Sequence, residues 1–225
     1  MVLKHNIEHI REIVKTYNRD ITLIAASKTQ TSETIDEFVK VAPDFILGEN
    51  RVQELVSKYN PNYVWHMIGQ LQANKVKYII DKVQLIHSLD RVALADEIEK
   101  QATKHNKVMD CLIEINMGAE ITKGGVSPSE VNAFIESMRN YSHINVKGVM
   151  AVLPNMEDKV ALGDMYKDLY KIYEEAKKLD GGNVDIKYLS AGMTNDYEIA
   201  LDNGSNMIRL GRVLFGERIY NANQV

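Results

Sequence analysis

The stretch ITLIAASKTQ, residues 21–30, places a lysine directly after an apolar run. Residues 21–27 carry small or apolar side chains on both faces, which is typical of a strand buried in a parallel sheet. A lysine at the point where such a strand ends is held partly out of water, with only its amine tip exposed. The stretch therefore predicts a fold built from βα units and a chemically useful amine at Lys28.

The rest of the chain repeats this unit, because strand-like runs alternate with amphipathic helical patterns from one end to the other. Eight strands are predicted, at residues 21–27, 44–48, 63–68, 83–89, 109–117, 145–152, 185–190 and 207–211. Ile7, Ile10 and Val14 lie at helical spacing and predict an extra helix at the N-terminus. Eight units in 225 residues favour a single (β/α)8 TIM barrel domain over residues 1–225. An open sheet of eight strands would need a longer chain and a glycine-rich nucleotide fingerprint, which the sequence lacks.

Composition excludes several classes of partner. The chain has 27 basic and 31 acidic residues, a net charge of −4, so no overall charge favours nucleic acid or an anionic membrane. It has no signal-peptide pattern and no apolar run of about 18 residues. The one cysteine, Cys111, lies in an apolar run and is expected to be a buried thiol. We expect a cytoplasmic protein that acts on a small molecule.

Functional residues of a (β/α)8 barrel lie at the C-terminal ends of its strands. The residues at the eight predicted ends are unusually polar, and they are Lys28, Gly48, Glu49, Asn50, His66, Gln70, His87, Ser88, Asp90, Glu114, Asn116, Met150, Ser190, Gly192 and Arg209 to Arg212. These residues are predicted to surround one mouth of the barrel.

Some of these residues also have a purely structural interpretation. Asp90 is a preferred residue type for capping the helix that follows it. Asn50 could be a turn residue, and Met150 could line the core. His66 and His87 could be hydrogen-bonded histidines of the core.

The loops after strands seven and eight have the features of a phosphate site. LSAGMTND, residues 189–196, supplies Ser190 and Gly192, and RLGRVLFGER, residues 209–218, supplies Gly211 before a short helical stretch. Such loops often hold phosphate in barrels through backbone N–H groups. An amine after strand one and a phosphate site here leave room between them for a phosphorylated aromatic aldehyde, and pyridoxal 5'-phosphate (PLP) fits.

Arg209 adds to this interpretation. PLP needs a lysine for its Schiff base and an aspartate or arginine beside its pyridine nitrogen. Arginine can only donate hydrogen bonds, so Arg209 would keep that nitrogen unprotonated and the ring a weak electron sink. Desolvation at the barrel mouth is expected to lower the pKa of Lys28, so that the neutral amine is accessible.

Eight motifs occur in order at these strand ends. They are AASKTQ, GENRVQE, WHMIGQLQANK, IHSLD, IEINMGAEITKGG, VKGVMAV, LSAGMTNDYEIAL and RLGRVLFGER. From about residue 5 to residue 218 the chain thereby resembles the pyridoxal phosphate homeostasis proteins, whose barrel is similar to the N-terminal domain of alanine racemase.

The resemblance implies a set of cofactor contacts and no metal ligand or catalytic residue. PLP would bind through Lys28, with Arg209 near the pyridine nitrogen. The implied phosphate contacts are Ser190, Gly192, Met193 and the backbone of Gly211 and Arg212, and the implied ring contacts are Asn50 and Met150. The family usually has threonine where this chain has Arg212, and often methionine in place of Ala191. Backbone donation at Arg212 would survive that change. Glu114, Asn116 and Lys123 receive no role from the resemblance.

Three functions remain open at this stage. The first is a monomeric PLP-binding protein that takes part in PLP homeostasis and delivery to apo-enzymes, without efficient catalysis. The second is an amino-acid racemase, which needs a second acid/base group opposite the lysine. Alanine racemase takes that group, a tyrosine, from a further domain that the sequence to Val225 does not show, and no tyrosine ends a predicted strand. The third is a class I aldolase for a sugar phosphate, which also uses a lysine and a phosphate site. The carrier is the interpretation we expect.

Overall fold

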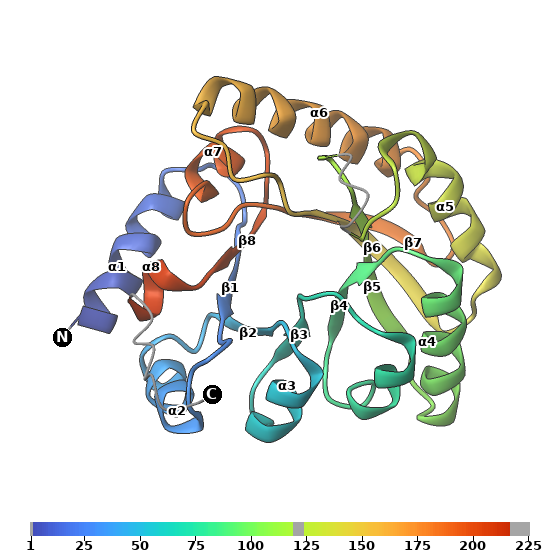
Figure 1. Cartoon of the computed structure of the whole chain (residues 1–225), viewed down its shortest axis with the longest axis horizontal. Coiled ribbons are helices and arrows are strands. Elements are labelled where there is room, and N and C mark those ends of the chain that lie inside the picture. Colours follow the sequence, from blue (N-terminus) through green and yellow to red (C-terminus); the bar gives the residue numbers. More distant parts are fainter. Residues whose placement is uncertain (1, 119–123, 217–225) are drawn as a thin grey trace.

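The computed structural model describes residues 2–118 and 124–216 of the chain. Eight parallel strands close into a barrel in chain order, with β1 paired to β8 (Figure 1). The strands are β1 Thr22–Ala26, β2 Ile46–Glu49, β3 Trp65–Met67, β4 Leu85–Leu89, β5 Met109–Ile115, β6 Ile144–Ala151, β7 Val184–Ser190 and β8 Met207–Leu210. The predicted (β/α)8 barrel is confirmed.

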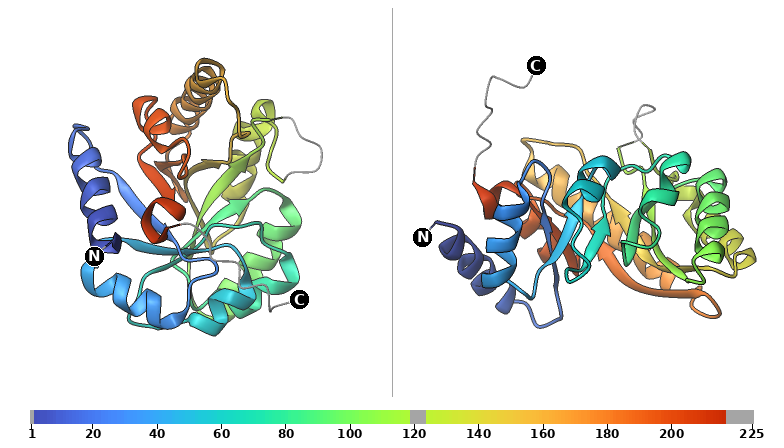
Figure 2. Two further views of the ribbon diagram at one scale, coloured as in Figure 1. Left: turned by 60° about the vertical axis from the view of Figure 1, so that its left-hand side comes forward. Right: turned by 90° about the horizontal axis from the view of Figure 1, so that it is seen from below.

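Helices surround the strands on the outside of the barrel (Figures 1 and 2). They are α1 Val2–Lys15, α2 Ser32–Val41, α3 Val52–Lys58, α4 Val92–Lys104, α5 Val131–Ser137, α6 Lys159–Lys177, α7 Tyr197–Asp202 and α8 Arg212–Phe215, with shorter 3-10 turns at Ala73–Tyr78, Pro128–Glu130 and Met138–Asn140. The predicted N-terminal helix is α1. Its Ile7 and Ile10 are buried, and Asn6 donates a hydrogen bond to the carbonyl of Leu214 in α8. Among the described residues, every helix is too short or too polar to span a membrane.

The apolar core has two parts. The larger part fills the space between the strands and the helices and includes Cys111, which is fully buried as predicted. The smaller part fills the barrel interior and consists of Ile24, Ala26, Ile68, Leu85, Leu112, Met150 and Met207. Met150 thus lies in the core, as one interpretation of the sequence held. The interior also contains buried polar side chains, which belong to the site described below.

Strand ends differ from the prediction by a few residues. The predicted second strand ends at Gly48, but β2 continues through Glu49, and β5 ends at Ile115, before Asn116. The sequence suggested that Asp90 caps α4, but the structure shows that it does not. Its carboxylate accepts hydrogen bonds from Arg91 Nη1 (2.5 Å) and from the backbone N–H of Gly125 (3.3 Å) instead. A guanidinium next in the chain competes successfully for that carboxylate, since a charged donor bonds more strongly than a helix N–H.

Candidate functional site

A cavity of about 410 Å³ opens where β1, β6, β7 and β8 end, a volume in the range of small-molecule sites. Its wall comes mainly from four segments of the chain, each of which contains or follows the C-terminal end of one of those strands. They are residues 26–30, 152–162, 193–196 and 209–216, with Asn50 and Ile68 completing the wall. The cavity therefore lies at the barrel end where the sequence predicted a site.

The cavity brings together most of the predicted site residues. Those that line it are Lys28, Asn50, Met193, Arg209, Gly211 and Arg212. The remaining three, Met150, Ser190 and Gly192, are not among the residues that line it. Met150 and Ser190 are adjacent across β6 and β7. Gly192 has a φ of +95°, and a side chain there would bring its Cβ within 2.6 Å of the Ala200 Cβ, so only glycine fits.

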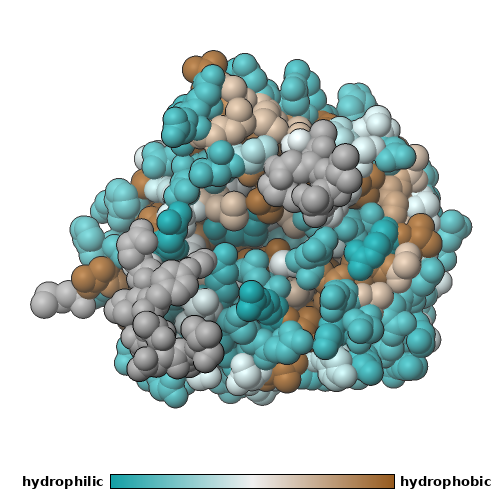
Figure 3. All heavy atoms as spheres, in the orientation of Figure 1, coloured by the Kyte–Doolittle hydropathy of each residue, from teal (hydrophilic) through white to brown (hydrophobic). Residues whose placement is uncertain are grey.

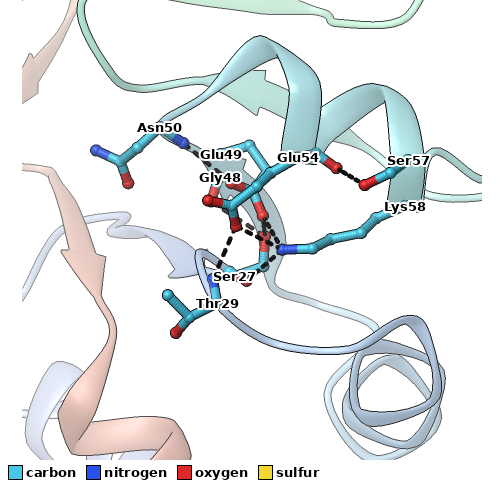
Figure 4. A network of polar contacts seen from close by, with 8 residues as sticks. All are labelled: Ser27, Thr29, Gly48, Glu49, Asn50, Glu54, Ser57 and Lys58. Atoms are coloured by element: carbon cyan, nitrogen blue, oxygen red, sulfur yellow. Dashed lines mark hydrogen bonds and ion pairs between the residues drawn. The ribbon is translucent and has the colours of Figure 1, made fainter. Parts of the chain in front are cut away.

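Lys28 lies in a turn, residues 27–29, that we call the lysine turn. Both of its flanking residues are fixed. The Ser27 hydroxyl donates to Glu49 Oε1 (2.9 Å), and the backbone N–H of Thr29 donates to Glu54 Oε2 (2.9 Å) (Figure 4). Thr29 adopts a φ of +68°, which is uncommon for a residue other than glycine. These hydrogen bonds therefore fix the backbone position from which the Lys28 side chain extends.

Lys58 links the two carboxylates that fix the lysine turn (Figure 4). Its ammonium donates to Glu49 Oε1 (2.8 Å), Glu54 Oε2 (2.9 Å) and the Ser27 carbonyl (3.2 Å). Burial opposes ionisation of Glu54, but the hydrogen bonds from Thr29 and Lys58 give a net lowering of its pKa. Glu49 Oε2 also accepts a hydrogen bond from the backbone N–H of Asn50 (3.1 Å). We call this network of Ser27, Glu49, Glu54 and Lys58 the Lys58 cluster, and it holds both the lysine turn and Asn50 at the cavity wall.

Arg209 is almost fully buried, and its guanidinium is held by three hydrogen bonds. Nη1 donates to the carbonyl (2.8 Å) and the hydroxyl (2.7 Å) of Ser190, and Nη2 donates to the carbonyl of Ala151 (2.9 Å). Burial lowers its pKa, but a guanidinium stays protonated in proteins. The cavity wall thus contains a fixed cation that can donate hydrogen bonds and cannot accept them.

Thr194 lies where the β7 and β8 loops meet, and the sequence analysis did not assign it a role. The backbone N–H groups of Gly211 and Val213 point at its hydroxyl, at 3.4 and 3.5 Å. Beside them, Arg212 Nη2 donates to Asn195 Oδ1 (3.0 Å). We call Thr194, Asn195, Gly211, Arg212 and Val213 the anion cradle. A hydroxyl four residues after Ser190, in a glycine-containing loop, was the signal in the sequence that could have identified Thr194.

The other polar strand-end residues lie away from the cavity wall. His66 and His87 are buried and hydrogen-bonded to each other, which confirms their interpretation as core histidines. Asn116 follows β5 and donates its backbone N–H to the Val126 carbonyl (3.0 Å). Lys123 lies outside the described residues. Within residues 2–118 and 124–216, no group of three or more side chains is arranged to bind a metal ion.

Glu114 is largely buried at the end of β5, and its Oε2 has no hydrogen-bond partner in the described part of the chain. Burial, reinforced by the charge of Asp90, raises the pKa of Glu114 to about 7 from an ordinary value of 4.5. A folded chain that holds this proton more tightly than the unfolded chain gains stability below pH 4.5. That gain is lost as the pH rises through 7.

We therefore expect Glu114→Gln to become more stable, relative to the unsubstituted chain, as the pH rises from 4.5 to 7. The relative change is up to about 3 kcal/mol, from the size of the pKa shift. Urea unfolding of both proteins across this pH range measures it. The two neutral histidines contribute the same pH dependence to both proteins, so the difference isolates Glu114. A difference that does not change with pH would contradict this account.

Comparison with known proteins places the chain in a family. The alanine racemase N-terminal domain family matches residues 2–219. The pyridoxal phosphate homeostasis protein of Aquifex aeolicus is 43% identical over 202 residues, which cover 88% of this chain and 87% of that protein. The protein of the same name from Pasteurella multocida is 32% identical over 225 residues, covering 97% and 95% of the two chains.

Solved structures share the barrel. PipY of Synechococcus elongatus, in a structure described as having PLP bound, superposes with a TM-score of 0.84 at 24% identity and covers 95% of this chain and 100% of its own. Alanine racemase of Clostridium difficile superposes with a TM-score of 0.74 at 16% identity, covering 98% of this chain but 58% of its own. These likenesses confirm the fold, and the sequence matches confirm the predicted resemblance. The chain belongs to the family of pyridoxal phosphate homeostasis proteins, which is built on the barrel of the alanine racemase N-terminal domain.

Proposed function

We propose that the chain, as one barrel domain over residues 1–225, binds PLP in the cavity through Lys28 and takes part in PLP homeostasis and delivery to apo-enzymes. One observation carries the proposal: Lys28, the donor-only cation Arg209 and four residues of the anion cradle (Thr194, Asn195, Gly211 and Arg212) line a single cavity. The names of the relatives and the PLP-bound description of PipY support it.

The residues present fit this cofactor. Asn50 lines the cavity, and its side-chain Oδ1 is buried without a hydrogen-bond partner in the described part of the chain. A buried acceptor of this kind calls for a ligand donor, and the phenolic group of PLP can supply one. Ala26 and Ile68 provide apolar surface for an aromatic ring. The anion cradle supplies backbone N–H groups of the type that bind phosphate.

Each group in the cavity has a separate task. The bound cofactor supplies an aldehyde that reacts with amines. Lys28 presents its amine from a turn that the Lys58 cluster fixes, and the neutral form of that amine is the nucleophile. Arg209 would donate a hydrogen bond to the ring nitrogen without transferring a proton to it, since a guanidinium keeps its proton in proteins. Thr194 and the N–H groups of Gly211 and Val213, which lie together in the structure, would hold the phosphate.

We propose a carrier rather than an efficient racemase. Racemisation needs a second acid/base group on the face opposite the lysine. Among the described residues, no tyrosine lines the cavity. Tyr166 lies close behind the wall, but its hydroxyl donates to Asp196 Oδ2 (2.7 Å), and burial raises its pKa well above the ordinary value. A tyrosine so placed retains its proton.

Two assays on the purified chain test this function. The first adds PLP and follows the visible absorption band of the lysine-bound form. The second measures racemisation of alanine, and then transfer of PLP to an apo-enzyme, monitored by the recovery of that enzyme's activity. We expect the band and the transfer, with racemisation near the rate of free PLP. Absence of a band removes the proposal, and racemisation at enzymatic rates would favour the racemase.

The anion cradle leads to a specific prediction. Thr194→Val removes the hydroxyl but keeps the shape, so PLP binding should weaken by about 10-fold or more, the usual range for a hydrogen bond to a charged group. Binding of pyridoxal, which lacks the phosphate, should stay unchanged. Equal losses for the two ligands would show that Thr194 does not contact the phosphate.

We also propose that the protein is a monomer. Hydrophilic side chains predominate on the face shown in Figure 3, where apolar residues are dispersed. The most exposed large apolar side chains, Val160 and Val2, lie on different helices. Light scattering at several protein concentrations tests this.

A further inference from the structure

A chain of hydrogen bonds crosses the interior of the barrel from β8 to β3. Arg209 Nη1 lies 2.7 Å from Ser190 Oγ, Ser190 Oγ lies 3.1 Å from His87 Nδ1, and His87 Nε2 lies 3.0 Å from His66 Nδ1. All four side chains are buried, with at most 5% of any of the four residues exposed. Only Arg209 reaches the cavity.

The chemistry of arginine gives this chain a direction. Arg209 can only donate, so Ser190 Oγ accepts from it. Of the two side chains in the described part of the chain that form hydrogen bonds with this hydroxyl, only His87 can accept its hydrogen, at Nδ1. His87 then carries its proton on Nε2 and donates it to His66 Nδ1. This direction requires both rings to be neutral. Burial lowers the pKa of His66 to about 3 and that of His87 well below its ordinary value.

We propose that Ser190 and His87 are positioning residues for Arg209, holding its guanidinium at the cavity wall through a directed hydrogen-bond chain. The inference rests on the proposed function, because the target of the guanidinium is the ring nitrogen of PLP. It assigns the Ser190 hydroxyl to Arg209, whereas the resemblance implied a contact with phosphate.

Cooperativity explains why His87 matters to a guanidinium that it does not touch. A hydroxyl that donates to His87 becomes a stronger acceptor for Arg209, because successive hydrogen bonds polarise one another. The contacts with Ser190 and Ala151 use three N–H donors of Arg209. A guanidinium has five donors, so two are left over for a ligand in the cavity that Arg209 lines. Loss of the chain leaves the same charge in place with a less defined direction.

The test compares substitutions that differ in one hydrogen-bond acceptor. His87→Leu removes the acceptor for the Ser190 hydroxyl, whereas His87→Asn retains one, because the asparagine Oδ1 occupies nearly the position of Nδ1. Ser190→Ala breaks the chain next to Arg209. Leu112→Ala is the matched control, since Leu112 lies in the interior apolar cluster and makes none of these hydrogen bonds. Each protein is loaded with PLP, and its visible absorption band is followed against pH.

We expect Ser190→Ala and His87→Leu to shift the absorption band and its pH midpoint in the same direction as Arg209→Lys. Both should also bind PLP and pyridoxal more weakly by the same factor, about 10-fold at most, because the guanidinium keeps its charge and its hydrogen bond to the ring nitrogen is weakened rather than removed. His87→Asn and Leu112→Ala should give the spectrum of the unsubstituted protein. If His87→Leu does not fold, the contrast between Ser190→Ala and His87→Asn still decides.

Two results would overturn the inference while leaving PLP binding intact. One is a Ser190→Ala protein that loses affinity for PLP but not for pyridoxal, which would show that the hydroxyl donates to phosphate and that the chain runs in the other direction. The other is an unchanged spectrum in both Ser190→Ala and His87→Leu. Failure of the unsubstituted chain to take up PLP is a separate outcome, which overturns the proposed function and this inference with it.

Discussion

Lys28→Ala abolishes the PLP adduct that borohydride fixes in the unsubstituted chain, and it lowers the affinity for PLP by at least about 100-fold, or roughly 2.7 kcal/mol. The substitution removes the amine that binds the aldehyde. It does not remove the bonds that hold the lysine turn, which come from the Ser27 hydroxyl and the Thr29 backbone. The anion cradle is untouched, so weak, phosphate-dependent binding remains. Mass spectrometry after reduction and equilibrium titration measure the two effects.

Lys159→Ala is the matched control for this substitution. Lys159 also lines the cavity, so its removal tests whether any lysine in the wall can bind the aldehyde. The account expects Lys159→Ala to retain the reduced adduct at full yield. An adduct that persists in Lys28→Ala and disappears in Lys159→Ala would transfer the covalent role to Lys159.

Lys58→Met lowers the free energy of unfolding by about 3–5 kcal/mol, the cost of leaving a buried carboxylate without its partner. The Lys58 side chain is 10% exposed and that of Glu49 is 0% exposed, at a distance of 2.8 Å between Nζ and Oε1. Methionine fills most of the space of the lysine stem, so the loss reflects charge more than packing. Urea denaturation at neutral pH measures it.

The double variant Lys58→Met with Glu49→Gln separates the two causes. A neutral amide at position 49 needs no cation, and it can still bond to the Ser27 hydroxyl and the Asn50 N–H. We therefore expect the double variant to regain about half or more of the lost stability, as strongly coupled neighbours do. If the losses of the single variants Lys58→Met and Glu49→Gln simply add in the double variant, the ion pair contributes little.

The fold could be predicted because buried parallel strands are apolar on both faces, a pattern that local sequence determines. The same pattern located the strand ends, and with them Lys28, Arg209 and Gly211 in the cavity wall. Strand limits were less certain, because they depend on where the neighbouring strand stops pairing. Asp90 shows a further limit, since the competition between a helix N–H and the Arg91 guanidinium cannot be seen from residue preferences.

The hydrogen bonds that hold the site residues in place could not be predicted from the sequence. His87 and Ser190 are 103 positions apart in the chain, and only the curvature and closure of the barrel bring them to 3.1 Å. The Lys58 cluster likewise depends on how α3 packs beside β2, so Glu49 was assigned to the mouth when its carboxylate faces Lys58 and Ser27. Thr194 was missed for a related reason, because its role depends on backbone N–H groups from another loop.

The central claim is that Lys28 is the residue to which PLP attaches. The most direct test is to add PLP to the purified full chain, reduce with borohydride, digest the protein and locate the modified peptide by mass spectrometry. The account predicts one stoichiometric adduct on the peptide that contains Lys28. A stoichiometric adduct on Lys159 or another lysine, or no adduct from a folded chain, would contradict it.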